Sequence, residues 1–237
     1  MPSGPLAWAV VVAAGSGSRF GSYKQFARLG GREVVEWSLE AAGRCCAGAV
    51  LVVPAELVAS HQGKADSVVA GEATRAGSVR AGLAAVPAQV DIVVVHDAAR
   101  PLASDATWRA VIAAVSAGAE AAVPCVPVTD TIKQRVAEGR LVTLPRGTLV
   151  AAQTPQAFRA SSLRSAHAGE AEATDDASLV EAAGGQVVEV PGEPGNLKIT
   201  APSDLAVAEA LLRTSARSSR GEVGGAGGAD RAGRAGL

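Results

Sequence analysis

Short runs of β-branched residues alternate along the chain with segments whose apolar residues recur at helical spacing. The runs at residues 7–12, 49–53, 66–70 and 91–95 predict strands. The fourth run is rich in valine, which is typical of a parallel strand whose two faces are both covered. The alternation therefore predicts an α/β fold with a mostly parallel central sheet and helices on both faces.

Two of the intervening segments carry the apolar stripe of an amphipathic helix. Ser104 precedes the second stripe and is a candidate helix cap. The apolar positions are Val34, Val35, Leu39 and Ala42 in the first helix, and Trp108, Val111, Ile112 and Val115 in the second. We interpret both stripes as core positions and not as part of a binding site.

Residues 131–147 interrupt the alternation. Two strand-like pieces flank the turn residues 137–139, and this pattern predicts a protruding β-hairpin. Because an isolated two-stranded ribbon is only marginally stable, the hairpin is a candidate dimerisation arm that packs on the same arm of a second subunit. A solvated surface hairpin is the alternative.

The stretch "NLKITAPSDLAVAEALLR", residues 196–213, predicts a strand that leads into a helix. Thr200 is the candidate cap, and Pro202 suits the first turn. The positions predicted to face inward are Leu205, Ala208 and Leu212. We expect one folded domain over residues 1–213. Residues 214–237 are rich in glycine, serine and alanine and predict a disordered tail.

The chain has 237 residues, a formal net charge of -1 and three cysteines. The near-neutral charge argues against nucleic acid or an anionic membrane surface as a partner, so any phosphate-binding charge has to be concentrated locally. Three cysteines without metal-ligand spacing predict neither a disulfide framework nor a zinc site. No apolar run reaches the length of a membrane span. We expect a cytoplasmic enzyme that acts on a small phosphorylated ligand.

Glycines and basic residues follow the first predicted strand in "VVVAAGSGSRFGSYKQF", residues 10–26. A dinucleotide-binding loop would need glycine where Phe20 stands, which argues against a dehydrogenase, and the context of Lys24 does not fit a nucleotide triphosphatase loop. The backbone N–H groups that could surround phosphate oxygens are those of Ala13, Ala14, Gly15, Ser16 and Gly17. Arg19 and Lys24 could stabilise charge that builds up during displacement at phosphorus; two solvated cations are the alternative.

The fourth predicted strand ends in "HDAARP", residues 96–101. Ligands of an open parallel sheet bind beyond the carboxyl ends of its strands, where Asp97 is placed. Its carboxylate is a candidate ligand for a hard divalent cation that also contacts phosphate oxygens, with a helix-capping aspartate as the alternative. We expect His96 to be a hydrogen-bonded structural residue, and Arg100 could bind a second phosphate.

The third predicted strand is followed by "AGEATRAGSVRAGL", residues 70–83. Gly71 and small residues precede a helix that we predict from Ser78. The segment suits a plain strand-to-helix connection equally well, and only its position at the same end of the sheet suggests contact with a nucleotide.

These motifs, in this order, resemble the 2-C-methyl-D-erythritol 4-phosphate cytidylyltransferase family of non-mevalonate isoprenoid synthesis. The resemblance covers about residues 7–213. Its most specific part is "HDAARP" together with "TPQ" and "NLKIT", whereas the glycine loop alone indicates only a sugar-nucleotide type of nucleotidyltransferase. The other matching segments are "AAGSGSRF…KQF", "TRAGSVRAGL", "PVTDTIK", "TPQAF" and "TDDASLVEAAG".

The resemblance implies a Rossmann-like nucleotidyltransferase domain, a homodimer joined through the hairpin arm, and Mg²⁺ or another divalent cation. It also implies that the phosphate of 2-C-methyl-D-erythritol 4-phosphate attacks the α-phosphorus of CTP and releases diphosphate. By position, the implied catalytic residues are Arg19, Lys24, Lys198 and Arg146, the last from the neighbouring subunit. The other implied contacts are Ala13 to Gly17, Gly71 and Ser78 for CTP, Asp97 for the cation, and Arg100, Thr131 and Thr174 for the acceptor.

Two rival interpretations remain open from the sequence. A ribitol-5-phosphate cytidylyltransferase would share the fold, the CTP site and the mechanism, although the implied acceptor residues favour methylerythritol phosphate. A non-catalytic nucleotide-binding homologue would be expected to lose Lys24, Asp97 or Lys198, and all three are present.

The chain departs from the family pattern in three respects. Tyr23 stands where a proline often precedes the lysine, and the interval from Arg19 to Lys24 is shorter than in many members. Glu72 replaces a glycine that is common in the turn near the cytosine. Its carboxylate would be unfavourable beside a nucleotide unless it points to solvent.

Overall fold

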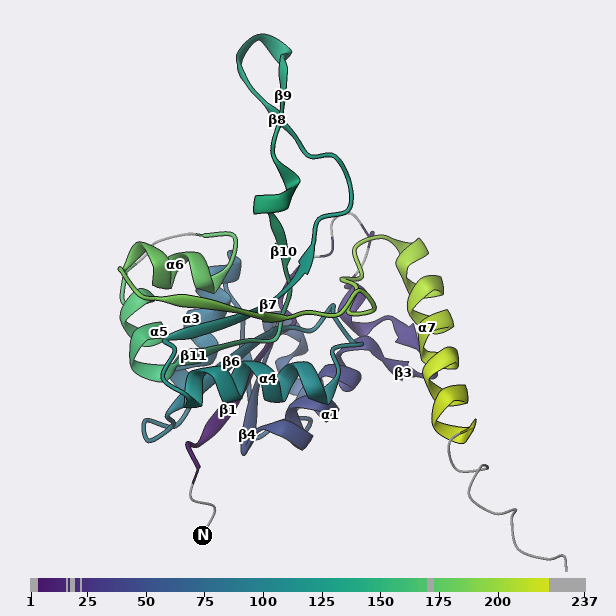
Figure 1. Ribbon diagram of the computed structural model, residues 1–237. Coiled ribbons are helices and arrows are strands. Elements are labelled where there is room, and N and C mark those ends of the chain that lie inside the picture. The colour runs from purple at the N-terminus through teal and green to yellow at the C-terminus, as the bar shows by residue number, and fades with distance from the viewer. Residues whose placement is uncertain (1–3, 16, 18–19, 22, 170–172, 222–237) are drawn as a thin grey trace, which may run out of the picture.

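A mixed sheet of eight strands forms the centre of the molecule (Figure 1). The computed structural model describes residues 4–15, 17, 20–21, 23–169 and 173–221. The strands of the sheet are β1 (Ala7–Val12), β4 (Gly48–Val53), β5 (Ser67–Ala70), β6 (Ile92–Asp97), β7 (Ala121–Pro127), β10 (Val150–Ala152), β11 (Gln156–Arg159) and β12 (Val187–Pro191). The smaller elements are η1 (Lys24–Phe26), β2 (Arg28–Leu29), β3 (Arg32–Glu33), η2 (Ala55–Leu57) and α2 (Val58–His61).

The strand order is β10-β7-β11-β6-β1-β4-β5, with β12 beside β7. β1 pairs in parallel with β4 and β6, as do β5 with β4 and β12 with β7. β11 is antiparallel to its neighbours β6 and β7, and β10 is antiparallel to β7. The expected mostly parallel sheet is confirmed, and the four predicted strands are β1, β4, β5 and β6 with small shifts at their ends.

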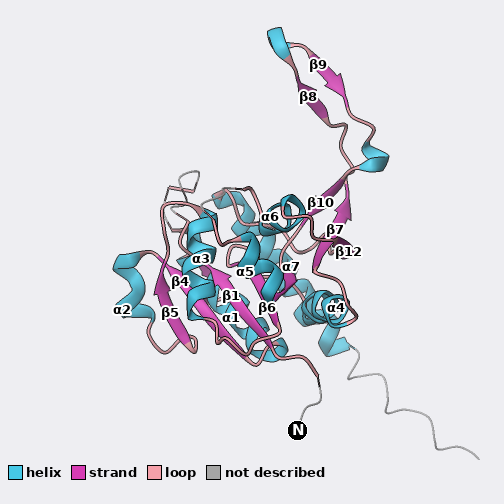
Figure 2. Ribbon diagram, turned by 90° about the vertical axis from the view of Figure 1, so that its left-hand side faces the viewer, coloured by secondary structure: helices cyan, strands magenta, loops and turns pink. Residues whose placement is uncertain are grey.

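Helices cover both faces of the sheet, as Figures 1 and 2 show. One face carries α1 (Val34–Cys45) and α4 (Asp105–Ser116), and the other carries α3 (Arg75–Ala85), α5 (Ala160–Ala166) and α6 (Asp176–Ala182). Successive residues of a strand point to opposite faces. In β1, Val11 therefore belongs to the apolar cluster that contains Trp108 of α4, whereas Val10 belongs to the cluster that contains Leu83 of α3.

Capping side chains precede the helices α3 and α4. Ser104 caps α4 as predicted, because its hydroxyl accepts a hydrogen bond from the backbone of the first turn. The predicted start of α3 at Ser78 is wrong, since the helix begins at Arg75. Thr74 is the cap that determines this earlier start, and its hydroxyl accepts a hydrogen bond from the first turn. The correction places Arg75 at the edge of the sheet where the strands end.

The predicted hairpin is confirmed, and it stands away from the sheet at the top of Figure 1. Its elements are β8 (Lys133–Arg135), η3 (Ala137–Gly139) and β9 (Leu141–Thr143), followed by η4 (Arg146–Thr148). Glu138 and Gly139 have positive φ angles of 61° and 74°, which reverse the chain. Leu141 and Val142 on this arm are 60% and 49% exposed, so the arm presents apolar surface.

Residues 196–200, which the structure describes in full, do not form the predicted strand. Ile199 donates a backbone hydrogen bond to the carbonyl of Ala99, and its side chain is buried in a cluster with Leu29 and Ala208. Packing of this apolar side chain holds the segment in place, so its apolar pattern was mistaken for a strand in the sheet.

The C-terminal helix α7 (Pro202–Gly221) follows this segment and runs past the predicted domain end at residue 213. Asp204 is the side chain at its start that accepts hydrogen bonds from backbone N–H groups, whereas Thr200, the predicted cap, donates its hydroxyl to the carbonyl of Lys198. The three positions predicted to face inward all pack in one cluster. The rest of the predicted tail, residues 222–237, lies outside the described residues. Within the described ranges no helix is long and apolar enough to cross a bilayer.

Helix α3 approaches the sheet very closely at Gly82. A Cβ atom at this position would lie 2.5 Å from Cγ1 of Val10 and 2.9 Å from Cγ2 of Val52. These separations are far inside van der Waals contact, so any side chain at position 82 would push the helix away from β1 and β4. Gly43 of α1 is exposed and has no atom within 4 Å of the corresponding position.

We expect Gly82→Ala to lower the free energy of unfolding by about 1–3 kcal/mol, because overpacking outweighs the better helix propensity of alanine. The matched control, Gly43→Ala, should raise it by about 0.5–1 kcal/mol through helix propensity alone. Urea denaturation followed by circular dichroism measures both. Equal stability of the two variants would contradict the close packing of α3.

Candidate active site

A cavity of about 440 Å³ opens at the carboxyl ends of β1, β5 and β6. It is lined by backbone and side chains from the loop after β1, the start of α3, the end of β6 and the segment before α7. The predicted site residues in its lining are Ala13, Ala14, Gly15, Lys24, Ser78, Asp97 and Lys198. Segments far apart in the sequence thus meet at the edge where an open parallel sheet binds ligands.

The side chain of Gln25 holds the loop after β1 through hydrogen bonds. This side chain is buried, and its amide donates hydrogen bonds to the carbonyls of Ala13 (2.5 Å) and Gly15 (2.9 Å). Both carbonyls are therefore engaged by a side chain that also lines the cavity. Gly71 is required beside this loop, because a Cβ there would overlap the methyl group of Ala14. Sequence reasoning missed Gln25, although it directly follows the predicted Lys24.

Lys24 lies at the start of η1. The preceding Tyr23 donates its hydroxyl to Oε1 of Glu56 (2.5 Å), and its ring meets that of Phe26 edge-on with centroids 6.2 Å apart. These contacts hold the backbone before Lys24. Two other predicted residues of this loop, Ser16 and Arg19, lie outside the described residues.

Asp97 is the last residue of β6 and faces two cations. Nε of Arg75 lies 3.2 Å from one carboxylate oxygen, and Nζ of Lys198 lies 2.6 Å from the other. Burial by itself would raise the pKa of Asp97, but the charges of Arg75 and Lys198 outweigh it and hold the pKa well below its ordinary value. Asp97 is therefore ionised at neutral pH.

His96 is structural, as expected. Its ring is fully buried, and Nδ1 lies 3.2 Å from the hydroxyl of Thr154, while Nε2 lies 3.1 Å from the carbonyl oxygen of Arg100. Burial lowers the pKa of His96 to about 4, so the ring is neutral at pH 7. The same Thr154 hydroxyl accepts the backbone N–H of Asp97 at 3.0 Å. This hydrogen bond fixes the backbone of the carboxylate.

The guanidinium of Arg100 is bound to the protein backbone. It donates to the carbonyl of Asn196 (2.7 Å) and, at 3.5 Å, to that of Ala152. Burial lowers the pKa of Arg100 from its ordinary value. These bonds tie the segment before Lys198 to the end of β6, and contact of Arg100 with an acceptor stays a prediction.

The remaining predicted acceptor residues lie apart from the cavity lining that the structure describes. Thr131 is exposed at the base of the arm. Arg146 lies in η4 and donates to the carbonyl of Thr129 at 2.7 Å. Thr174 is exposed beside Asp175, which caps α6. In one chain Thr131 and Arg146 thus lie on or beside the arm, whereas Thr174 lies just before the start of α6.

Sequence reasoning also missed Arg75 and Asp176. Arg75 reaches from the first turn of α3 to both Asp97 and the buried Asp176. Burial alone would lower the pKa of Arg75, but these two carboxylates raise it above its ordinary value. Arg75 lies in the motif "TRAGSVRAGL" and Asp176 in "TDDASLVEAAG", so membership of these motifs could have marked both as candidate site residues.

The side chain of Glu72 is exposed to solvent, as the sequence analysis requires of a carboxylate near a nucleotide. Its side chain is 55% exposed, and its carboxylate lies 4.0 Å from the guanidinium of Arg80. The side chain of Glu72 packs against Gly77, because a Cβ atom built at position 77 would lie only 2.9 Å from the Cβ of Glu72. The carboxylate is therefore solvated at the rim of the cavity.

The donor set fits a cation that shares its shell with a substrate. Among the described residues, no group of three or more His, Cys, Asp or Glu side chains could hold a metal ion. Asp97 offers ionised, hard oxygen atoms at the cavity. Mg²⁺ is commonly bound through one or two carboxylates together with substrate phosphates and water. The site thus suits a cation that binds together with a triphosphate.

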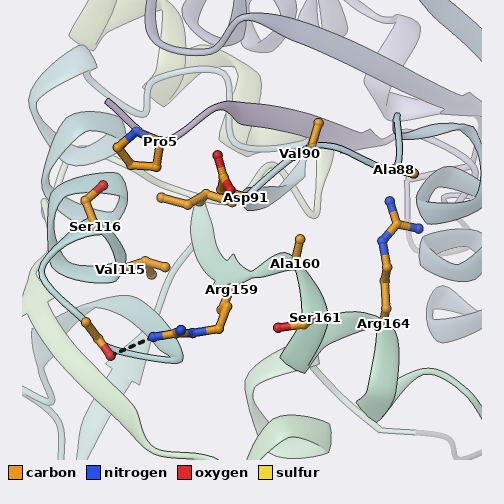
Figure 3. Close-up of a pocket in the computed structure, with 12 residues that line it drawn as sticks. Pro5, Ala88, Val90, Asp91, Val115, Ser116, Arg159, Ala160, Ser161 and Arg164 are labelled. Atoms are coloured by element: carbon orange, nitrogen blue, oxygen red, sulfur yellow. Dashed lines mark hydrogen bonds between the residues drawn. The ribbon is translucent and has the colours of Figure 1, made fainter. Parts of the chain in front are cut away.

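A larger cavity, of about 670 Å³, lies at the opposite ends of the strands (Figure 3). Its arginines are engaged by the backbone: Arg159 donates to the carbonyl of Gly118, and Arg164 to those of Leu83 and Val86. None of the predicted site residues lines it. The smaller cavity is therefore the candidate active site.

Comparison with known proteins identifies the family of the chain. Residues 7–214 match the family model described as 2-C-methyl-D-erythritol 4-phosphate cytidylyltransferase. A curated relative of that name from Frankia casuarinae is 45% identical over 217 residues, which cover 88% of this chain and 82% of the relative. A bifunctional enzyme IspD/IspF from Solidesulfovibrio magneticus is 42% identical, and the match covers 86% of this chain but only 56% of that longer protein.

Solved structures show the same fold. The 2-C-methyl-D-erythritol 4-phosphate cytidylyltransferase of Thermus thermophilus has a TM-score of 0.75 and 38% identity, covering 86% of this chain and 98% of that one. The 4-diphosphocytidyl-2C-methyl-D-erythritol synthase of Anaerococcus prevotii has a TM-score of 0.76 and 30% identity, covering 89% and 100%. The chain therefore belongs to the 2-C-methyl-D-erythritol 4-phosphate cytidylyltransferase family.

Proposed function

We propose that this chain transfers the cytidylyl group of CTP to 2-C-methyl-D-erythritol 4-phosphate, with release of diphosphate, in non-mevalonate isoprenoid synthesis. The observation that carries the proposal is the meeting of Lys24, Asp97 and Lys198 in one cavity beside a small-residue loop. Each comes from a different part of the chain, and each occupies a motif of the family to which the chain belongs.

The chemistry needs alignment and charge more than proton transfer. An oxygen of the acceptor phosphate forms a bond to the α-phosphorus of CTP, and the bond from that phosphorus to the bridging oxygen of the diphosphate breaks. Because the acceptor is already ionised, no general base is needed. Lys24 and Lys198 would offset the repulsion between two polyanions, as would Arg19 in the part of the loop that is not described.

Asp97 would hold a magnesium ion, or another divalent cation, against the triphosphate. A bound cation supplies positive charge to phosphate oxygens during displacement. The partly buried, ionised carboxylate of Asp97 and the absence of a larger acidic cluster among the described residues support a single protein ligand. The residues of the chain bind and orient the phosphates around it.

The acceptor site would be completed across a homodimer. The exposed apolar side chains Leu141, Val142 and Val150 on and beside the arm support burial against a second copy. Thr131 and Arg146 on this arm would then reach the partner's cavity, where Arg100, Thr174 and Lys198 complete the acceptor contacts. A cytoplasmic location is part of the proposal, supported by the free thiols of Cys45, Cys46 and Cys125.

Purified protein incubated with CTP and magnesium should release diphosphate with 2-C-methyl-D-erythritol 4-phosphate and not with ribitol 5-phosphate. The contacts of the acceptor phosphate are shared by both polyols, so the difference has to come from the carbon skeleton. A coupled diphosphate assay on both acceptors, with an acceptor-free control, measures it. An equal or faster rate with ribitol 5-phosphate would overturn the acceptor, and no release with either would overturn the proposed transfer.

Gln25→Glu should weaken both the fold and the CTP site. A carboxylate cannot donate to the carbonyls of Ala13 and Gly15, so we expect a loss of about 1–3 kcal/mol in the free energy of unfolding. CTP affinity should fall about tenfold, as for a loss of about 1.4 kcal/mol. Urea denaturation and calorimetric titration with CTP test this, with Gln62→Glu in an exposed turn as the charge-matched control. Unchanged CTP affinity would refute the role of Gln25.

Lys24→Ala and Arg146→Ala should each lower kcat by at least about 10²-fold, as expected for loss of a preorganised charge. If Arg146 acts in the partner's cavity, a heterodimer of the two variants contains one intact site and should regain up to about half of the wild-type rate. Differently tagged subunits, purified as heterodimers, allow this measurement. Complete inactivity of verified heterodimers would place Arg146 in the site of its own subunit.

A further inference from the structure

Arg75 connects two carboxylates from distant parts of the chain. Its Nε lies 3.2 Å from Oδ1 of Asp97, and its Nη1 lies 2.7 Å from Oδ2 of Asp176. Asp97 ends β6 at the cavity, whereas Asp176 begins α6 on one face of the sheet. A planar guanidinium can serve two acceptors in different directions at once, and an ammonium on a flexible stem cannot reproduce that geometry.

Arg75 is itself held in place by groups deeper in the protein. Asp176 is completely buried, and its second oxygen lies 3.0 Å from Nε2 of the buried His167. With both carboxylate oxygens engaged, Asp176 has a fixed orientation. The guanidinium therefore has an anchor on the side away from the cavity.

The two cations on Asp97 differ in how firmly they are held. The side chain of Lys198 is 42% exposed and touches Oδ2, whereas that of Arg75 is 24% exposed and touches Oδ1. In the proposed reaction Lys198 would contact the acceptor phosphate, and Oδ2 of Asp97 would then lose its lysine partner. Asp97 would be free to rotate at that moment unless its other oxygen were retained.

We propose that Arg75 is a positioning residue that holds Oδ1 of Asp97 and thereby orients the carboxylate that would bind the cation, and that Asp176 acts on the reaction through Arg75. The inference rests on the proposed function, since it concerns the orientation of the cation ligand in that site. In the proposed reaction neither Arg75 nor Asp176 touches the reacting atoms. Their effect is on the geometry of the carboxylate and hence on cation binding.

The test uses the full-length chain and begins with Arg75→Lys, which keeps the charge. We expect kcat to fall about 10–100-fold, as is typical when an outer partner of a metal ligand is removed. The affinity for CTP measured without a divalent cation should change less than about threefold, because the phosphate loop and Ser78 are untouched. Binding of Mn²⁺ in the presence of CTP, followed by electron paramagnetic resonance, should weaken about tenfold or more.

Arg164→Lys is the matched control. Arg164 also bridges two groups, the carbonyls of Leu83 and Val86 at the other end of α3, and it lies in the cavity of Figure 3. Its replacement should lower the melting temperature without changing kcat or Mn²⁺ binding. Wild-type kcat and Mn²⁺ binding in Arg75→Lys would overturn the inference, as would the same losses in Arg164→Lys. No turnover by the wild-type protein would instead refute the proposed function.

A double-mutant cycle tests the link from Asp176 to the site. Asp176→Asn alone should lower kcat, but in the Arg75→Lys background it should add less than about threefold, because the path is already broken. If the fold losses in kcat of the two single variants multiply in the double variant, Asp176 does not act through Arg75. If Asp176→Asn does not fold, His167→Gln replaces it in the same cycle, since it removes the other partner of Asp176.

Discussion

The register between β1 and β6 is the constraint on which the site depends. In this parallel pair Val12 lies opposite Asp97, and β4 continues the ladder with Val52 opposite Val12. The loop that follows Val12 and the carboxylate of Asp97 therefore begin at the same level of one sheet edge. A slip of one residue would turn Asp97 to the other face of the sheet. Backbone hydrogen bonds thus place the phosphate loop and the cation ligand before any side chain acts.

Side chains then convert this edge into a charged site. The chain carries a formal net charge of only -1, so the positive charge needed for two phosphorylated substrates has to be gathered locally. Lys24 and Lys198 supply it from opposite ends of the chain, and Arg75 balances the buried Asp176 as well as Asp97. Asp97 stays ionised in a partly buried place because Arg75 and Lys198 lie against its carboxylate and lower its pKa.

The sequence was sufficient for what is encoded locally. Apolar runs predicted the central strands, a turn pattern predicted the arm, and motifs predicted Lys24, Asp97 and Lys198. It was not sufficient for groups defined by distant partners. The role of Arg75 depends on Asp176, which is 101 residues away, so no spacing rule could identify it. The segment before α7 was mistaken for a strand because an apolar residue held by packing gives the same local pattern as one in a ladder.

The position of Lys198 late in the chain affects the order in which the site forms during synthesis on the ribosome. Lys198 adjoins Ile199, whose side chain is buried with Ala208 of α7, and no ladder of strand pairing holds it. The strands β1, β4, β5 and β6 are all synthesised before residue 100, so this part of the sheet can form early. Lys198 and the helix that packs on Ile199 are synthesised only after these strands. A truncated or unfinished chain would therefore contain a phosphate loop without the means to use it.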